Sequence, residues 1–166
     1  MQPRTCLYSA ALLGLLAGGA LAADLAVGDA EGIPLGITSV PVTIANTADA
    51  ISMVVFEVTP DPQLGVPTAV PGPDQPNLQP EDVFIDPLGG GVYRVTAFVL
   101  GAPDIGDGHL LSLEFNTTGL PTETFFVPAA AGELLTIGNV DVTGALDGGS
   151  ITINASISEN DWTMLE

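Results

Sequence analysis

Two glutamates are the side chains of this chain best placed for acid–base chemistry. Glu57 and Glu114 each fall at an outward position of a predicted strand. Paired carboxylates can hydrolyse a glycosidic bond when they stand about 5–9 Å apart in a cleft. A flat strand surface offers neither the apolar pocket that raises the pKa of one carboxyl group nor walls that hold a sugar. We therefore expect both side chains to be solvated or to contact a partner.

The remaining candidates for catalysis are few. His109 is the only histidine and stands at the start of an apolar strand, which favours a structural role at a turn over general-base catalysis. No serine lies in a Gly-x-Ser-x-Gly segment, the turn that exposes the nucleophile of many hydrolases. The only cysteine, Cys6, lies in the N-terminal leader, so the rest of the chain has no thiol nucleophile and no disulfide. We predict no catalytic residue and a protein that is not an enzyme.

The segment Asp104-Ile105-Gly106-Asp107-Gly108 is the candidate for a cation site. It is acidic and glycine-rich, but it lacks the carboxylates at positions one, three and five that a calcium-binding loop requires. A turn is the favoured interpretation, and no cofactor is predicted. Calcium held by loops that are distant in the sequence stays open as an alternative.

The charge of the chain is strongly one-sided. It has 20 Asp and Glu against 2 Lys and Arg, a formal net charge of −18 at pH 7. Loss of the leader removes Arg4, leaves Arg94 as the only basic side chain and brings the net charge to about −19. Such a surface repels phosphates, which excludes nucleic acids and anionic membranes as partners. The charge favours solubility in a salty medium, with binding of calcium or of a basic partner as the alternative.

Residues 1–23 are predicted to be a secretory signal peptide. Arg4 supplies a positive start, Leu12 to Leu16 an apolar stretch, and Ala20-Leu21-Ala22 a small-residue cleavage pattern. The apolar stretch is shorter than the roughly 20 residues that a membrane span needs. We therefore expect a secreted protein, extracellular or periplasmic, with no membrane insertion after cleavage.

The elements that position the candidate residues are expected to be strands. No segment after the leader keeps an apolar period of 3.6 residues, and Gly and Pro recur throughout. About nine short strands separated by turns predict an all-β fold, a two-sheet antiparallel β-sandwich of jelly-roll type. One domain is expected over 24–154, followed by a C-terminal tail at 155–166. The predicted strands are 24–28, 38–46, 51–58, 82–86, 92–100, 109–117, 124–128, 134–142 and 150–157.

The stretch from Pro60 to Pro80 differs from the rest because it holds seven prolines. Proline lacks the backbone donor that a strand ladder needs, so a long ladder strand is not expected here. We predict a partly extended surface connection that crosses from one sheet to the other.

Three segments, in this order along the chain, resemble the cohesin domain family. They are Val40-Pro41-Val42-Thr43-Ile44 with the following strand around Phe56, then Gly106 to Phe115, and finally Gly148 to Ile153. The resemblance spans roughly residues 24–154. It implies a jelly-roll sandwich and a non-catalytic module that binds a dockerin-like extracellular protein in a polysaccharide-degrading assembly. Two alternatives are direct binding of a polysaccharide and a structural subunit of an extracellular matrix or filament.

The resemblance also implies a binding surface. In the family, the sheet that contains the strand at 51–58 receives the dockerin on its outer side, next to the strands matching 92–100 and 109–117. Alternation along these strands then predicts an apolar centre with an arginine and a polar rim, as protein interfaces have. The alternative is that the proline-rich connection covers this surface. The predicted partner-binding residues are Met53, Val55, Glu57, Arg94, Thr96, Phe98, Leu110 and Glu114.

Direct binding of a polysaccharide requires a row of exposed aromatic rings. Phe56, Tyr93 and Phe115 are at the inward phase of their strands and are expected in the core. Trp162 lies in the C-terminal tail. A platform of three rings is hard to assemble from the aromatic residues that are left.

Overall fold

The computed structural model describes residues 22–47, 50–100 and 104–155, so Cys6, Trp162 and most of the predicted leader lie outside it. The described residues form strands joined by turns, with two short 3-10 helices, η1 (Pro62–Leu64) and η2 (Pro80–Asp82). None of the helices in this part of the chain has the length and apolar character to cross a bilayer. The strands are β1 (Ala23–Val27), β2 (Asp29–Gly32), β3 (Ile37–Ala45), β4 (Ile51–Val58), β5 (Thr68–Pro71), β6 (Val83–Gly89), β7 (Val92–Phe98), β8 (Gly108–Asn116), β9 (Thr124–Val127), β10 (Ala129–Thr136), β11 (Thr143–Asp147) and β12 (Gly149–Ile153).

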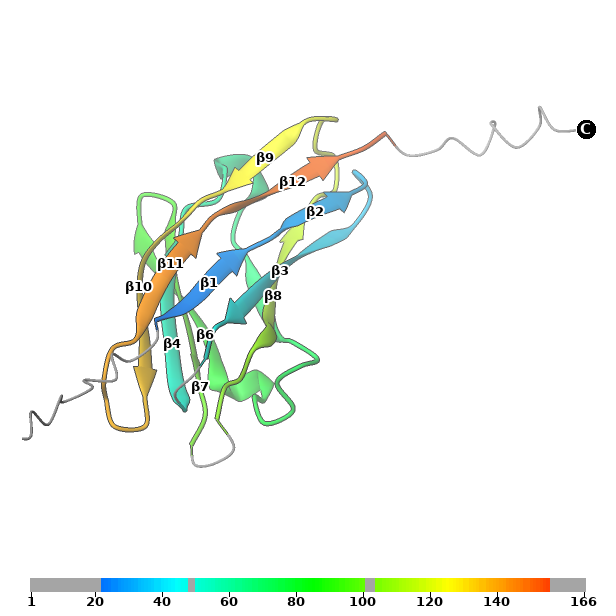
Figure 1. The fold of residues 1–166 in the computed structure, drawn as a ribbon. Coiled ribbons are helices and arrows are strands. Elements are labelled where there is room, and N and C mark those ends of the chain that lie inside the picture. The colour runs from blue at the N-terminus through cyan, green and yellow to red at the C-terminus, as the bar shows by residue number, and fades with distance from the viewer. Residues whose placement is uncertain (1–21, 48–49, 101–103, 156–166) are drawn as a thin grey trace, which may run out of the picture.

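The strands form a β-sandwich (Figure 1). One layer is a four-stranded sheet in the order β10-β4-β7-β6, and all its pairs are antiparallel. The other layer is a five-stranded sheet in the order β11-β1-β3-β8-β5. A three-stranded sheet, β2-β12-β9, prolongs it, because β2 follows β1 and β12 follows β11 along the same line. The predicted all-β sandwich of jelly-roll type is confirmed.

The first and last strands pair with each other in parallel. Ala23 to Ala26 of β1 pair with Thr143 to Asp147 of β11, and all of β2 pairs with β12. The two pairs meet at Gly28 and Gly149, where a Cβ atom on Gly149 would overlap the carbonyl group of Gly28. This close approach of two backbones requires glycine.

The core lies between the layers and follows from the period of two in the strands. On β3, Val40, Val42 and Ile44 are buried while Ser39 and Thr43 are exposed. Facing them from the four-stranded sheet are apolar side chains such as Phe56 and Val95, both with no exposed surface. Alternation of this kind packs one side of each strand inward.

All nine predicted strands overlap observed ones, but three observed strands were not predicted. β2, β5 and β11 have four or five residues each and hold at most one large aliphatic side chain apiece, so no alternation marks them. β5 lies within the proline-rich connection and pairs with β8 at the edge of its sheet, where Pro71 removes no needed donor. The prediction at 134–142 overlaps only the end of β10, because the chain turns after Thr136.

Candidate functional site

Six of the eight residues predicted to bind a partner lie on one surface, the outward side of the four-stranded sheet. Alternation along β4 turns Val54, Phe56 and Val58 into the core and leaves the residues between them pointing outward. Strand pairing aligns these outward residues with those of β10, β7 and β6 in three rows, and we call this surface the outer face. The rows are Leu135–Met53–Phe98, Glu133–Val55–Thr96–Phe84 and Ala130–Glu57–Arg94–Asp86.

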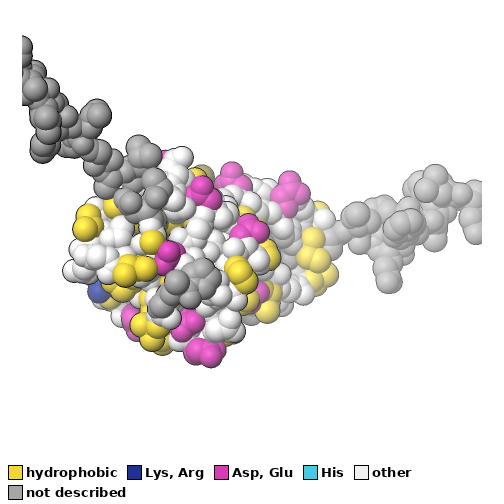
Figure 2. Space-filling model, turned by 60° about the horizontal axis from the view of Figure 1, so that its bottom comes forward, with side chains coloured by type: hydrophobic (Ala, Val, Ile, Leu, Met, Phe, Trp, Pro, Cys, Tyr) yellow, Lys and Arg dark blue, Asp and Glu magenta, His cyan; other side chains and the backbone are white. Residues whose placement is uncertain are grey.

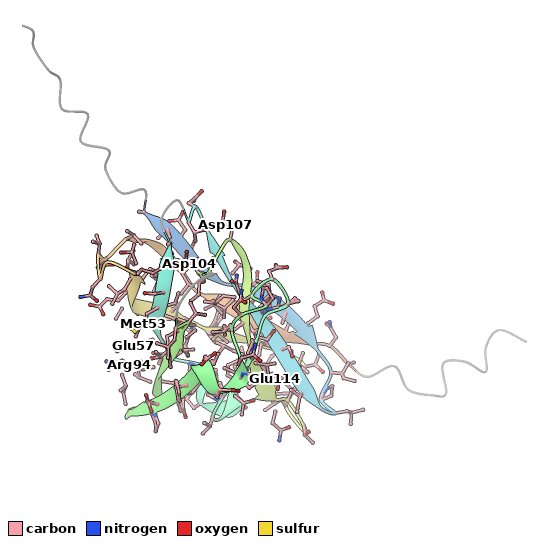
Figure 3. All side chains as sticks on the ribbon, turned by 90° about the horizontal axis from the view of Figure 1, so that it is seen from below. Met53, Glu57, Arg94, Asp104, Asp107 and Glu114 are labelled. Atoms are coloured by element: carbon pink, nitrogen blue, oxygen red, sulfur yellow. The ribbon has the colours of Figure 1, made fainter. Side chains whose placement is uncertain are left out.

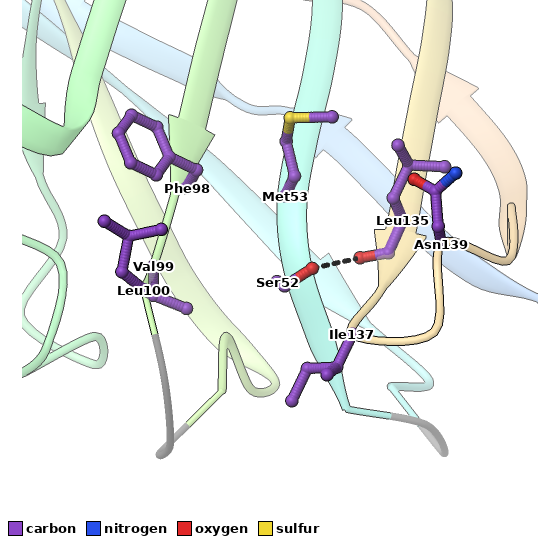
Figure 4. Close-up of a pocket in the computed structure, with 8 residues that line it drawn as sticks. All are labelled: Ser52, Met53, Phe98, Val99, Leu100, Leu135, Ile137 and Asn139. Carbon is purple, nitrogen blue, oxygen red and sulfur yellow. Dashed lines mark hydrogen bonds between the residues drawn. The ribbon is translucent and has the colours of Figure 1, made fainter.

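The first row opens into a hollow of about 580 Å³, which we call the apolar hollow. It lies between the end of β7, the start of β4 and the turn that follows β10 (Figure 4). The Ser52 hydroxyl donates a hydrogen bond to the carbonyl oxygen of Leu135 at 3.3 Å, so the proton of this hydroxyl is already hydrogen-bonded within the sheet. The lining is mainly apolar and comprises Ser52, Met53, Phe98, Val99, Leu100, Leu135, Ile137 and Asn139.

Two aromatic rings extend the apolar surface toward β6. Phe84 and Phe98 stack with their ring centroids 5.7 Å apart and their planes 6° from parallel. Phe84 keeps 45% of its surface exposed, whereas Phe98 is more enclosed. The stack supports the Phe98 ring, which still lines the apolar hollow, and leaves part of the Phe84 ring open to a ligand.

A second hollow of about 640 Å³ adjoins the first, and Met53 lines both. Glu57, Asp86, Glu133 and Arg94 supply its charged lining, and we call it the acidic hollow. Arg94 Nη2 donates to Glu57 Oε1 at 2.9 Å, with the side chains 46% and 23% exposed. An ion pair this exposed contributes at most about 1 kcal/mol to stability. One base among three carboxylates leaves the hollow with a net negative charge.

Solved structures show which known fold this chain shares. A chain in a type I cohesin–dockerin complex from Clostridium thermocellum is 18% identical with a TM-score of 0.69, and the match covers 80% of this chain and 99% of that chain. The sixth cohesin of scaffoldin B from Acetivibrio cellulolyticus, solved with a mutant dockerin, matches at 19% identity with a TM-score of 0.67, over 80% of this chain and 99% of that chain. The chain has a cohesin fold.

A non-cellulosomal cohesin from the archaeon Archaeoglobus fulgidus has the same fold, with 20% identity and a TM-score of 0.63 over 87% of this chain and 99% of that chain. No protein-family model matches the sequence, and no curated protein matches it. The similarity in fold to these solved structures confirms the predicted resemblance to cohesins.

Leu110 does not belong to the surface of this cohesin fold, and its prediction was wrong. Its side chain has no exposed surface. In the β3–β8 ladder, Val42 pairs with Leu111 and Thr43 with His109, so Leu110 is an extra residue in β8. A bulge of this kind breaks the alternation, and here both Leu110 and Leu111 point into the core.

Glu114 lies on the other sheet of the cohesin fold. Its strand, β8, pairs with β3 and β5 rather than with β4 or β7. Glu114 is opposite Ser39, whose hydroxyl donates to Glu114 Oε1 at 3.5 Å. Figure 3 shows Glu114 well apart from the group of Met53, Glu57 and Arg94. The expectation that Glu57 and Glu114 stand on neighbouring strands was therefore wrong, and they do not form a carboxylate pair.

The proline-rich connection does not cover the outer face. Its strand β5 pairs with β8 in the opposite sheet, from Thr68 opposite Glu114 to Pro71 opposite Leu111. The connection is anchored by Leu64 and Leu78, both buried, and by Gln75, whose side-chain amide exchanges two hydrogen bonds with the backbone of Gly106. This agrees with the prediction of a crossover between the sheets.

The predicted turn at Asp104 to Gly108 leads into β8 and ties two loops together. Asp107 Oδ1 accepts hydrogen bonds from the backbone N–H and the hydroxyl of Thr47 at 2.8 and 2.7 Å, and these bonds lower the pKa of Asp107. Within the described ranges, no three His, Cys, Asp or Glu side chains come together as a metal site. His109 Nε2 lies 3.0 Å from both the Leu111 carbonyl oxygen and the Ser112 hydroxyl. This ring nitrogen is therefore hydrogen-bonded within its own strand, β8.

Sequence reasoning missed the parts of the outer face that β6 and β10 contribute. Phe84 and Asp86 alternate with Val83 and Ile85 within the predicted strand 82–86, a pattern that could have placed both on this surface. The contribution of β10 was harder to find, because a register shift between Ala130 and Glu133 interrupts its alternation. It adds Glu133, Leu135 and, from the following turn, Ile137.

Proposed function

We propose that the chain is a secreted, non-catalytic binding module that captures a dockerin-type partner on its outer face. The observation that carries the proposal is apolar surface left open on a cohesin fold. Met53, Phe98 and Leu135 line one hollow of that face. Along the described chain, no loop or strand lies over it. Apolar centres with charged rims are typical of protein interfaces, and partly enclosed aromatic side chains are frequent energetic anchors there.

Two of the similar structures support the class of partner. The proteins from Clostridium thermocellum and Acetivibrio cellulolyticus were solved in complexes with dockerins. Transfer of this partner class to the present chain rests on the shared fold, and transfer of the surface rests on the open outer face. A secreted location agrees with the signal-like leader.

Direct binding of recombinant dockerin modules tests the proposal. The chain from Ala23 onward, which keeps all of β1, would be immobilised, and each dockerin encoded in the producing organism's genome would be passed over it. We expect at least one to bind, and we expect Phe98→Ala to weaken that binding by about 2 kcal/mol or more, as loss of an aromatic anchor does. Phe126→Ala is the matched control, because Phe126 is 65% exposed on β9, away from the outer face.

Other outcomes would contradict the proposal in recognisable ways. Equal loss of dockerin binding in the Phe126→Ala variant would move the site off the outer face. Retention on insoluble cellulose or chitin, without dockerin binding, would support the carbohydrate-binding alternative. Polymers that grow with protein concentration would support a structural subunit instead.

A further inference from the structure

We infer that the apolar and acidic hollows form one two-part site for a partner segment with a bulky apolar side chain at one end and a basic side chain at the other. The inference rests on the proposed function and adds the partner's chemistry and its direction along β4. The apolar end lies toward Ser52, where β4 begins, and the basic end lies toward Glu57, near its end. The two hollows share one wall, the side chain of Met53.

The apolar hollow is suited to one large aliphatic or aromatic side chain. Its volume of about 580 Å³ is large enough to admit any single side chain, and its lining is mainly apolar. Its rim carries Ile137, 61% exposed, and Leu100, 91% exposed. Exposed side chains of this kind gain from burial when a partner covers them. Met53 at the boundary is unbranched and can adjust to the shape of the inserted group.

The acidic hollow is suited to a cation. Glu57, Asp86 and Glu133 line this hollow together with Arg94, whose guanidinium already pairs with Glu57 at 2.9 Å. Asp86 lies directly opposite Arg94 in the β6–β7 ladder. Two carboxylates beyond the ion pair therefore remain for a lysine or arginine of the partner. The opposite choice, an acidic partner, would meet three carboxylates on this face and a chain with a net charge of −18.

The spacing of the two halves follows from strand geometry. Met53 and Glu57 are four residues apart on β4, about 13 Å along the strand. A partner segment must therefore hold its apolar and basic groups about 10–15 Å apart on one side. A second copy of this chain fits poorly, because a symmetric contact places the same acidic surface on both sides. Figure 2 shows acidic side chains spread over the surface of the molecule that faces the viewer.

The experiment uses a defined probe, an alanine-rich helical peptide with a leucine and, seven residues later, an arginine. These side chains share one helix face about 10 Å apart, and the arginine side chain spans the remaining distance. Nitrogen-15-labelled protein from residue 23 onward would be titrated with the peptide by NMR. We expect shifts confined to β4, β6, β7 and β10. Replacing the peptide's leucine by alanine, or its arginine by glutamate, should each weaken binding about tenfold.

Protein variants test each half separately. Leu135→Ser should weaken binding of the peptide about tenfold and Asp86→Asn about threefold, while Arg94→Gln should strengthen it about threefold by removing a like charge. Ile137→Ser replaces Leu135→Ser if that variant does not fold by circular dichroism. Phe126→Ser is the control and should change nothing. Loss of binding in Arg94→Gln, equal binding of the glutamate peptide, or no binding at all would overturn the inference.

The failure of this inference can be told apart from failure of the proposed function. A dockerin whose binding falls with Phe98→Ala but is unchanged by Leu135→Ser and Asp86→Asn leaves the proposed function standing and overturns the two-part site. The reverse pattern, peptide binding at both hollows with no dockerin bound, retains the site and overturns the dockerin as its partner.

Discussion

Phe98 belongs to both the fold and the outer face, and its two contributions can be measured separately. Its ring stacks on Phe84 at 5.7 Å and also lines the apolar hollow. We expect Phe98→Ala to lower the free energy of unfolding by about 1 kcal/mol through loss of the stack, more than an ordinary surface substitution. Urea unfolding followed by circular dichroism measures this. A loss of several kcal/mol would mean that Phe98 belongs to the core rather than to the outer face.

Val95, three residues earlier on β7, belongs to the core, because its side chain has no exposed surface. Val95→Asp would bury a charge without a partner, and we expect it to prevent folding. Thr96→Asp is the matched control, since Thr96 lies on the outer face of the same strand. The control should remain folded by circular dichroism and thermal melting. Similar melting of the two variants would invalidate the inward and outward assignment of β7.

Asp107 makes the stability of the fold depend on pH through a single side chain. Hydrogen bonds from Thr47 lower the pKa of Asp107 from its ordinary value of 3.8. A carboxylate with a lowered pKa in the folded state stabilises the fold above its unfolded pKa and loses this contribution as the pH falls through the folded value. Asp107→Asn should therefore be less stable than the wild type at pH 7 by a few tenths of a kcal/mol, and the difference should disappear as the pH falls through the lowered pKa of Asp107.

Urea midpoints of the wild type and Asp107→Asn between pH 7 and pH 2 would measure this difference. Asp147→Asn is a suitable control, because Asp147 is exposed on β11 and makes no side-chain hydrogen bond to a described residue. A difference between wild type and Asp107→Asn that grows as the pH falls would contradict the prediction.

At the scale of elements, alternation in the sequence was enough to predict the strands that build both layers. β3 alternates over its whole length, β4 from Met53 to Val58 and β7 from Arg94 to Phe98, and this settled which side chains point inward. The partner of β8 could not be predicted in this way, because alternation says which side of a strand is buried but not which sheet it joins. The bulge at Leu110 left only a pair of neighbouring leucines as its trace. These two gaps explain why Leu110 and Glu114 were assigned to the wrong surface.

The β8 bulge leads to a stability prediction. Leu110 has no exposed surface, so Leu110→Ala should lower the free energy of unfolding by about 2–4 kcal/mol, as other large-to-small core substitutions do. Ser112→Ala, two residues along the same strand and partly exposed, removes only the hydrogen bond to His109 and should lower it by no more than about 1 kcal/mol. Chemical denaturation of both variants would decide. Equal, small effects would mean that Leu110 faces solvent.

At the scale of the whole molecule, charge governs how stability depends on salt. The net charge of −18 makes the folded chain repel itself, and screening should relieve this. The Debye length falls from about 30 Å at 0.01 M to about 8 Å at 0.15 M ionic strength. We therefore expect the melting temperature to rise by several degrees over this range of sodium chloride. Calorimetry at a series of salt concentrations tests it, and a falling melting temperature would show that attractive pairs outweigh the repulsion.

The parallel pairing of the first and last strands has a mechanical consequence. β1 with β2 runs beside β11 with β12 in the same direction, so the start of β1 and the end of β12 lie at opposite ends of this ribbon. Tension between the two termini would then pull the paired strands past each other in shear. All the hydrogen bonds of the ribbon would share the load at once instead of opening one by one. A module tethered at both ends in a moving fluid would gain strength from that geometry.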